Sequence, residues 1–251
     1  MVKKQSLEKE KVNTKFNLEE MMGKGLHLGH QISKLHPKMS DNIMGVKNTV
    51  HIIDLEKTAK SLEEAMIFIE GLFREGGSIV LVGTKPPFRK IIQETAKECE
   101  IPYVVERWLG GTFTNHKVIS NRTKYYQDIK KKKEGGDFES LTKKEKIRIN
   151  KKLEKLRRKF EGIKDLGKIP EAVFVCDIYR DQACVKEANN IGVKVVAIVD
   201  TNVDPSLVDF PILANDDAIP SVQYILDKLK EAIMKSKIPM PNNIKSNPKS
   251  K

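Results

Sequence analysis

Three strongly apolar segments, at 78–83, 172–177 and 193–200, constrain the fold of this chain most strongly. Each run is typical of a strand that is buried on both faces of a sheet, and segments with helical periodicity alternate with these runs. Strands that alternate with helices along a chain predict a parallel sheet covered by helices on both faces. The expected fold class is therefore α/β.

Shorter elements complete the alternation at both ends of the chain. A helix capped by Asn17 is expected to end near Gly23. Further strands are predicted at 50–54, 102–105 and 210–213, and further helices at 55–73, 91–99, 181–190 and 219–234. Together they predict one discontinuous α/β domain at 17–113 and 165–234, a flexible basic tail at 1–16 and a disordered basic tail at 235–251.

The composition argues against several classes of protein. The chain has no run of eighteen apolar residues and no apolar signal segment, so we expect a cytoplasmic protein with no membrane partner. Its three cysteines include no Cys-x-x-Cys pair, which gives no support for a disulfide framework or a structural zinc site. The net charge of +12 favours polyanionic partners instead.

The positive charge is concentrated between residues 114 and 164. This segment holds 18 Lys and Arg residues against 7 Asp and Glu residues, which accounts for nearly all of the net charge. Residues at spacings of four and three, as in the seam of a coiled coil, recur at Val118, Arg122, Tyr125 and Ile129 and again at Ile149, Leu153, Leu156, Phe160 and Ile163. Thr142 and Glu145 form a capping-box pattern before the second series. We therefore predict that an antiparallel two-helix coiled-coil hairpin, residues 114–164, interrupts the α/β domain.

So narrow a seam leaves the basic faces of the hairpin exposed. Like charges four residues apart destabilise a helix, so the one-sided excess of lysine favours contact with nucleic acid over a merely solvated surface. Lysine acts as a point charge, and we expect contacts with phosphates and no reading of the base sequence. The predicted contact residues on the hairpin are Lys117, Arg122, Lys124, Lys130, Lys131, Lys132, Lys133, Lys143, Lys144, Lys146, Arg148, Lys151, Lys152, Lys155, Arg157, Arg158 and Lys159.

The stretch RWLGGTFTN, residues 107–115, joins a predicted strand to the first basic helix. It contains the only tryptophan, Trp108, which is expected to hold the base of the hairpin against the sheet. Gly110 and Gly111 are predicted to act as a structural hinge because glycine permits unusual backbone angles. Arg107 is the residue of this stretch that we expect to reach nucleic acid.

Two patterns at the ends of predicted strands could instead belong to a nucleotide or metal site. Gly83-Thr84-Lys85 follows a buried strand, but it matches neither the phosphate-binding P-loop nor the dinucleotide fingerprint. Asp177 and Asp200 each end a strand at the carboxyl edge of the sheet, where ligands of open α/β sheets bind. A nucleotide- or metal-dependent enzyme that uses this edge is therefore the alternative function, although both aspartates also suit ordinary turns.

The remaining candidates give weak support for metal binding or catalysis. His27 and His30 have a spacing that could suggest zinc, but nearby glycines and Pro37 break any helix that would hold both on one face. We expect these histidines to be hydrogen-bonded loop residues or, with Lys38, contacts to phosphate. No motif for Ser/His/Asp or Cys/His catalysis is present, so the residues leave an enzyme open but without support, and we expect no metal, no cofactor and no small-molecule substrate.

Several ordered motifs closely resemble the bacterial family of small-subunit ribosomal protein two. They are GLHLGHQ at 25–31, PKM at 37–39, HIIDLEKT at 51–58, RWLGG at 107–111, LTKKE at 141–145, IVDTN at 198–202 and NDDA at 215–218. The resemblance runs from about Leu18 to Leu229. Departures from the usual residues of the family occur at Leu35-His36, Pro86-Pro87-Phe88 and Leu213-Ala214.

The resemblance implies a flavodoxin-like parallel sheet interrupted by a coiled-coil hairpin, and a structural role without catalysis in the small ribosomal subunit. The implied partners are small-subunit ribosomal RNA and neighbouring small-subunit proteins, including the large protein one that captures messenger RNA. A coiled-coil adaptor for another protein remains a third interpretation of the hairpin.

Overall fold

The computed structural model describes residues 16–237, and a five-stranded parallel sheet forms its centre. The sheet has the order β5-β4-β6-β7-β8, with β4 at Ile79–Val82, β5 at Tyr103–Val104, β6 at Ala172–Val175, β7 at Lys194–Val199 and β8 at Phe210–Leu213. Numbered from its first strand this is the order 2-1-3-4-5, that of the flavodoxin-like fold. The predicted parallel sheet is therefore confirmed.

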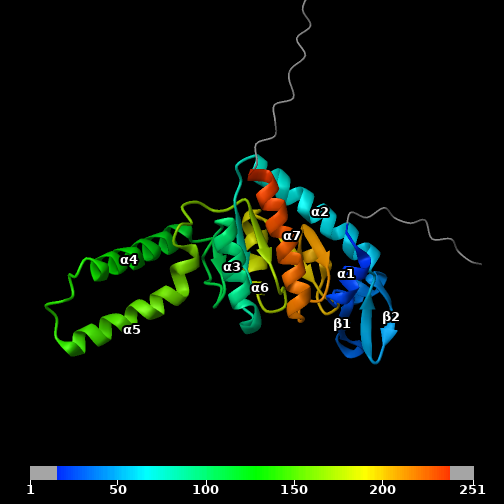
Figure 1. Cartoon of the computed structure of the whole chain (residues 1–251), viewed down its shortest axis with the longest axis horizontal. Helices are drawn as coiled ribbons and strands as arrows, with labels where there is room; N and C mark the ends of the chain where they lie inside the picture. The colour runs from blue at the N-terminus through cyan, green and yellow to red at the C-terminus, as the bar shows by residue number, and fades with distance from the viewer. Residues whose placement is uncertain (1–15, 238–251) are drawn as a thin grey trace, which may run out of the picture.

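Helices cover both faces of this sheet, as the sequence predicted (Figure 1). Ile79 and Leu81 of β4 pack with α2 (Leu55–Arg74), α3 (Arg89–Cys99) and α7 (Ile219–Lys237) in one core cluster. Val80 and Val82 point to the opposite face, where α6 (Gln182–Ile191) and the base of the hairpin contribute to a second cluster. Successive side chains of a strand alternate between faces, so continuous apolar runs supply both cores.

A second, antiparallel sheet lies beside the first and differs from the sequence-based expectation. It has the order β1-β3-β2, with β1 at Leu28–Gln31, β2 at Ile43–Lys47 and β3 at Val50–Ile53. The strand predicted at 50–54 was assigned to the parallel sheet, and that assignment was wrong. Asn48 and Thr49 both have positive φ angles, which makes them a two-residue hairpin turn that ties β3 to β2.

The remaining elements are short or belong to the inserted segment. The short helix α1 (Leu18–Gly23) begins at the predicted cap, where the Asn17 side chain accepts hydrogen bonds from two backbone N–H groups. Helices α4 (His116–Glu134) and α5 (Lys143–Phe160) extend away from the α/β domain (Figure 1). The 3₁₀ helices are η1 at Ile32–Lys34, η2 at Pro37–Asn42, η3 at Pro86–Phe88, η4 at Glu161–Ile163 and η5 at Pro205–Leu207.

The described residues correct the predicted limits of both tails. Phe16 was assigned to the N-terminal tail, but it packs against the main core cluster. Helix α7 continues to Lys237, three residues beyond its predicted end, and the ammonium group of Lys237 lies 3.0 Å from the carbonyl oxygen of Cys99. The rest of both predicted tails lies outside the described residues. Within residues 16–237, no helix is both long and apolar enough to cross a membrane.

Candidate nucleic-acid interface

Helices α4 and α5 are joined by a turn around Gly135 and Gly136, and they contact each other. The predicted capping box of α5 is present: the Thr142 hydroxyl accepts from the backbone N–H of Glu145, whose carboxylate accepts from the backbone N–H of Thr142 at 3.0 Å. Asn115 precedes α4 but makes no capping bond with its side chain. The sequence therefore specifies the start of α5 more strongly than the start of α4.

The inner face of α4 is shifted by one residue from the predicted seam. Thr123 and Tyr126 are buried and Ile119 is half-buried, whereas Val118 and Tyr125 are each 46% exposed. The prediction that Arg122 lies in the seam was wrong, because its side chain is on the exposed face. On α5 the predicted positions do face inward, from half-buried Ile149, Leu153 and Leu156 to buried Phe160, with Ile163 buried in the 3₁₀ helix that follows.

The base of the hairpin is part of the protein core. Tyr126, Phe160 and Ile163 belong to the same cluster as the sheet residues Val80 and Val82. The Tyr126 hydroxyl donates a hydrogen bond to the Glu161 carboxylate, and the Gln127 amide donates to the carbonyl oxygen of Lys164 at 3.0 Å. These contacts fix the base of the hairpin, while its distal part projects into solvent (Figure 1).

Most positive side chains of the hairpin have no acidic partner. Of the 18 Lys and Arg residues between 114 and 164, four form an ion pair with a described residue: Lys130 and Lys164 with Glu161, and Arg157 and Arg158 with Glu154. In the rest of the described chain, ten of the 20 Lys and Arg residues form such an ion pair. The hairpin therefore presents uncompensated positive charge.

Twelve of these side chains are exposed and also form no hydrogen bond to a described residue. They are Lys117, Arg122, Lys124, Lys131, Lys132, Lys133, Lys143, Lys144, Arg148, Lys151, Lys155 and Lys159, which we call the free hairpin cations. Two further predicted contacts are held locally, since Lys146 donates to the carbonyl oxygen of Glu139 at 2.7 Å and Lys152 donates to the Tyr125 hydroxyl. Unpaired cations along two helices suit a ligand that carries a row of negative charges.

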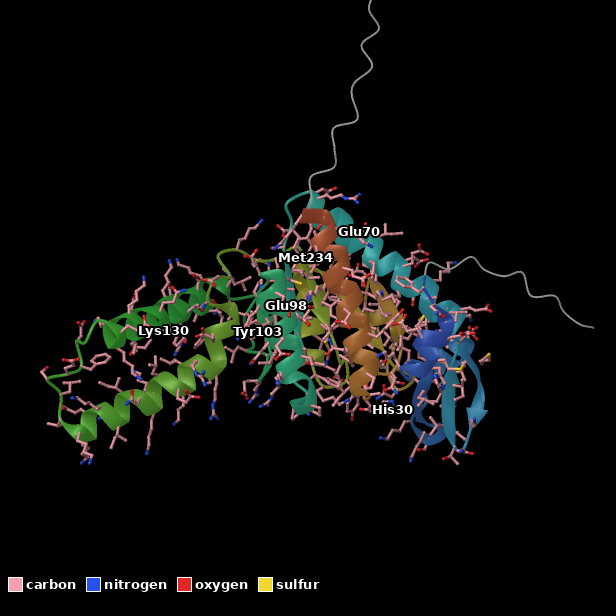
Figure 2. All side chains as sticks on the ribbon, in the orientation of Figure 1. His30, Glu70, Glu98, Tyr103, Lys130 and Met234 are labelled. Carbon is pink, nitrogen blue, oxygen red and sulfur yellow. The ribbon has the colours of Figure 1, made fainter. Side chains whose placement is uncertain are left out.

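The predicted contacts outside the hairpin lie in two different places. Arg107 is exposed at the foot of the hairpin. His27, His30 and Lys38 belong to the region of the antiparallel sheet, and Figure 2 shows His30 far from Lys130. The charge of Lys38 is paired with Asp204 at 2.7 Å. The structure therefore does not bring these three residues together with the hairpin.

A single buried carboxylate organises the loop at residues 107–115. Glu187 of α6 accepts hydrogen bonds from the indole N–H of Trp108 at 2.8 Å, from the backbone N–H groups of Gly111, Phe113 and Thr114, and from the Thr114 hydroxyl. Burial opposes its negative charge, but the hydrogen bonds from Trp108 and this loop outweigh that effect and lower the pKa of Glu187. The sequence analysis did not identify Glu187.

Trp108 fills the space beside this carboxylate. Its side chain is 5% exposed and packs edge to face on Phe113, with 4.9 Å between the ring centroids. Both rings belong to the core cluster that contains Tyr126 and Phe160. Trp108 therefore belongs to one packed cluster with residues of the hairpin base and the sheet, while its indole N–H donates to Glu187.

The two glycines of the loop differ in their backbone requirements. Gly111 has a φ of +87°, and an added Cβ would lie 3.2 Å from the Cβ of Asn115. Gly110 has no positive φ and has open space around it, so its backbone conformation does not require glycine. We expect Gly111→Ala to lower the free energy of unfolding by roughly 1–2 kcal/mol and Gly110→Ala to change it little. Equal effects of the two substitutions in urea unfolding would contradict this assignment.

The carboxyl edge of the parallel sheet is closed by internal contacts. The backbone N–H and the hydroxyl of Thr84 donate to Asp181 at 3.1 and 2.9 Å. The ammonium group of Lys85 lies 3.3 Å from Asp177 and also pairs with Asp216 and Asp217. Three aspartates already compensate the charge of the Lys85 ammonium group at this edge, and the alternative of a nucleotide-dependent enzyme is not supported.

His30 joins this acidic group from the antiparallel sheet. Its Nδ1 lies 3.1 Å from Asp200 and its Nε2 lies 3.4 Å from Asp217, so it is a paired residue of strand β1 and not a loop residue. The ligand atoms of His30, Asp216 and Asp217 lie within 4.8 Å of one another and could hold a cation. The sequence analysis missed this group because its members are far apart along the chain.

The buried carboxyl of Asp216 makes folding stability depend on pH. Burial, together with Asp200 and Asp177, raises the pKa of Asp216 to about 7, above its ordinary value of 3.8. The folded chain then binds more protons than the unfolded chain between these values, so stability rises as pH falls from 8 to 5.5. The hydrogen bond to Asp200 raises the pKa of His30, which adds stability in the same direction.

We expect the free energy of unfolding to rise by roughly 2 kcal/mol between pH 8 and pH 5.5, and Asp216→Asn to remove most of that rise. Urea unfolding at both pH values measures it, with Asp128→Asn on the exposed face of α4 as the control. A pH dependence that is the same in both variants would show that Asp216 does not titrate in this range.

Comparison with known proteins gives one consistent result. The family model for ribosomal protein S2 matches residues 21–236. A small ribosomal subunit protein uS2 of Dictyoglomus thermophilum is 42% identical over 220 residues, which cover 88% of this chain and 89% of that protein. The protein of the same name from Dictyoglomus turgidum is 41% identical over 220 residues, with the same coverage.

Proposed function

The chain belongs to the ribosomal protein S2 family, and we propose that it binds small-subunit ribosomal RNA through the free hairpin cations. It is a structural constituent of the small ribosomal subunit in the cytoplasm and supports translation without catalysing a reaction. Its association with ribosomal RNA and with other proteins of the subunit follows from this membership.

One observation carries the proposal: the hairpin concentrates exposed cations that have no acidic partner among the described residues. Each cation that meets a phosphate releases a condensed counterion, and this release drives binding without regard to sequence. The rigid base supports this role, because the contacts of Glu187, Trp108 and Tyr126 fix the position of the helices. Arg107 extends the positive surface to the foot of the hairpin.

We do not extend the proposal to the three predicted contacts near the antiparallel sheet. His30 and Lys38 are paired with aspartates of the same chain. Burial, with a contribution from Lys47, lowers the pKa of His27, which favours a neutral imidazole. None of the three therefore offers a free charge to a phosphate.

A protein partner is proposed for the antiparallel sheet. Met44 and Val46 of β2 are 63% and 53% exposed, and Met22 of helix α1 is 56% exposed; exposed apolar side chains favour contact with another protein. A neighbouring small-subunit protein, with the large protein one as our candidate, would cover this surface.

Sedimentation of the tagged chain tests the proposed function. In a sucrose gradient of cell lysate, the chain should migrate with small subunits and assembled ribosomes, and it should remain there after mild nuclease treatment that removes messenger RNA. A chain that stays at the top of the gradient, or that migrates with a protein complex free of ribosomal RNA, would contradict the proposal and favour the adaptor interpretation.

A further inference from the structure

A cavity of about 660 Å³ lies where the hairpin meets the α/β domain. Its walls come from the end of α3, from β5 and the residues that follow it, and from the end of α5 with η4. Figure 2 shows Tyr103 in this region, between α3 and α5. The cavity lies next to the proposed RNA-binding surface, and none of the contacts described above for that surface requires it.

The close packing of Gly162 against β5 shapes this cavity. A Cβ at Gly162 would lie 2.0 Å from the carbonyl oxygen of Tyr103 and 2.8 Å from its ring. Only glycine permits so close an approach of the two backbones. The tyrosine ring is thereby held in a fixed position at the wall, half-buried, and its hydroxyl forms no hydrogen bond to a described residue.

The charge of the lining favours an anionic ligand. Six of the lining residues are Lys or Arg and four are Asp or Glu. Three of the four acids are already paired: Glu106 with Arg89 at 3.1 Å, Glu161 with Lys164 at 3.3 Å, and Glu100 with Lys237 at 2.9 Å. Lys97 and Lys159 line the cavity and form no ion pair with a described residue, so they remain available to a ligand.

We infer that this cavity receives a single unstacked nucleotide of RNA, with its base against the Tyr103 ring and its phosphate beside Lys97 and Lys159. The inference rests on the proposed function and goes beyond it, since it assigns one site for a looped-out nucleotide next to a surface that binds continuous backbone. A volume of several hundred Å³ is typical of a pocket for a small ligand. Proteins bind looped-out bases by stacking them on aromatic rings or guanidinium planes. Arg157 and Arg158 are also lining residues, but their guanidinium groups pair with Glu154, which leaves the Tyr103 ring as the stacking surface.

The test compares two RNA duplexes that differ by one bulged nucleotide, using the full chain. The bulge carries 2-aminopurine, whose fluorescence falls when the base stacks. We expect the chain to bind the bulged duplex about tenfold more tightly than the continuous one and to quench the fluorescence. Tyr103→Phe should keep both effects because it keeps the ring, and Tyr103→Leu should lose both. Tyr125→Leu, which removes an exposed tyrosine of α4, is the matched control and should keep both effects.

The outcomes separate this inference from the proposed function. Equal binding of both duplexes by the unmodified chain, or a bulge preference that survives in Tyr103→Leu, would overturn the inference and leave RNA binding by the hairpin intact. A short polyglutamate peptide that restores the 2-aminopurine fluorescence at constant ionic strength would also overturn the inference. The ligand of the cavity would then be an acidic segment of a protein. Failure of the chain to bind either duplex at low salt would instead contradict the proposed function.

Discussion

Replacement of eight free hairpin cations by glutamine is expected to lower the affinity for small-subunit ribosomal RNA by about a thousandfold at 0.1 M salt. The eight residues are Lys117, Lys124, Lys131, Lys132, Lys133, Lys144, Lys151 and Lys155. Each substitution removes one cation that can meet a phosphate and release a counterion. Glutamine and lysine have similar helix propensities, and all eight side chains are exposed, so the fold should be retained. Filter binding or fluorescence anisotropy measures the affinity.

A matched variant separates a local effect from an effect of total charge. It replaces eight exposed or half-buried lysines outside the hairpin: Lys24, Lys34, Lys47, Lys57, Lys60, Lys90, Lys186 and Lys235. Both variants lose the same charge, but only the hairpin variant should lose RNA affinity by this factor. A similar loss in both would mean that binding depends on net charge and that the hairpin has no special role. Substitution is preferable to deletion of residues 114–164, because Tyr126, Phe160 and Ile163 are part of the core.

Glu187→Gln is expected to lower the free energy of unfolding by roughly 2–4 kcal/mol. The carboxylate accepts five hydrogen bonds from the loop between β5 and α4. An amide has one oxygen that can accept, and its NH₂ group would face donors, so buried N–H groups would lose their partners. The base of the hairpin should loosen, and limited proteolysis should cut α4 and α5 faster than the α/β domain.

Glu94→Gln provides the control for this substitution. Glu94 is exposed on α3, and its only ion pair within the described chain is a 3.9 Å contact with Lys90, so its replacement should change stability little. Urea unfolding of both variants gives the comparison. A hairpin in Glu187→Gln that is as resistant to proteolysis as in the unmodified chain would show that this carboxylate does not hold the base.

The elements of the parallel sheet could be predicted from the sequence because their local signals are strong. The run from Ile79 to Val82 is apolar at every position, and both cores of the sheet need those side chains. The capping box at Thr142 is likewise a local signal, and the structure forms it. The antiparallel sheet gave no comparable signal, because its turn at Asn48 and Thr49 has no glycine although both residues have positive φ.

Most of the site features that the sequence analysis missed are contacts between residues that lie far apart along the chain. Glu187 lies more than 70 residues from the groups that it binds, and one glutamate on a helix is usually a solvated residue. The residues that pair with His30, Asp200 and Asp217, are even farther from it along the chain. On α4, polar Thr123 occupies the inner face while apolar Val118 lies outside, so hydrophobic spacing alone gave the wrong register.

The salt dependence of RNA binding tests most directly whether the free hairpin cations supply the contacts to RNA phosphates. If about eight hairpin cations meet phosphates, the logarithm of the association constant should fall with the logarithm of salt concentration at a slope of about −6 to −7. The eight-residue hairpin variant should show a much shallower slope, set by the four free hairpin cations that remain, and the matched variant outside the hairpin should keep the original slope. An unchanged slope in the hairpin variant would contradict the account, because the RNA contacts would then lie elsewhere on the molecule.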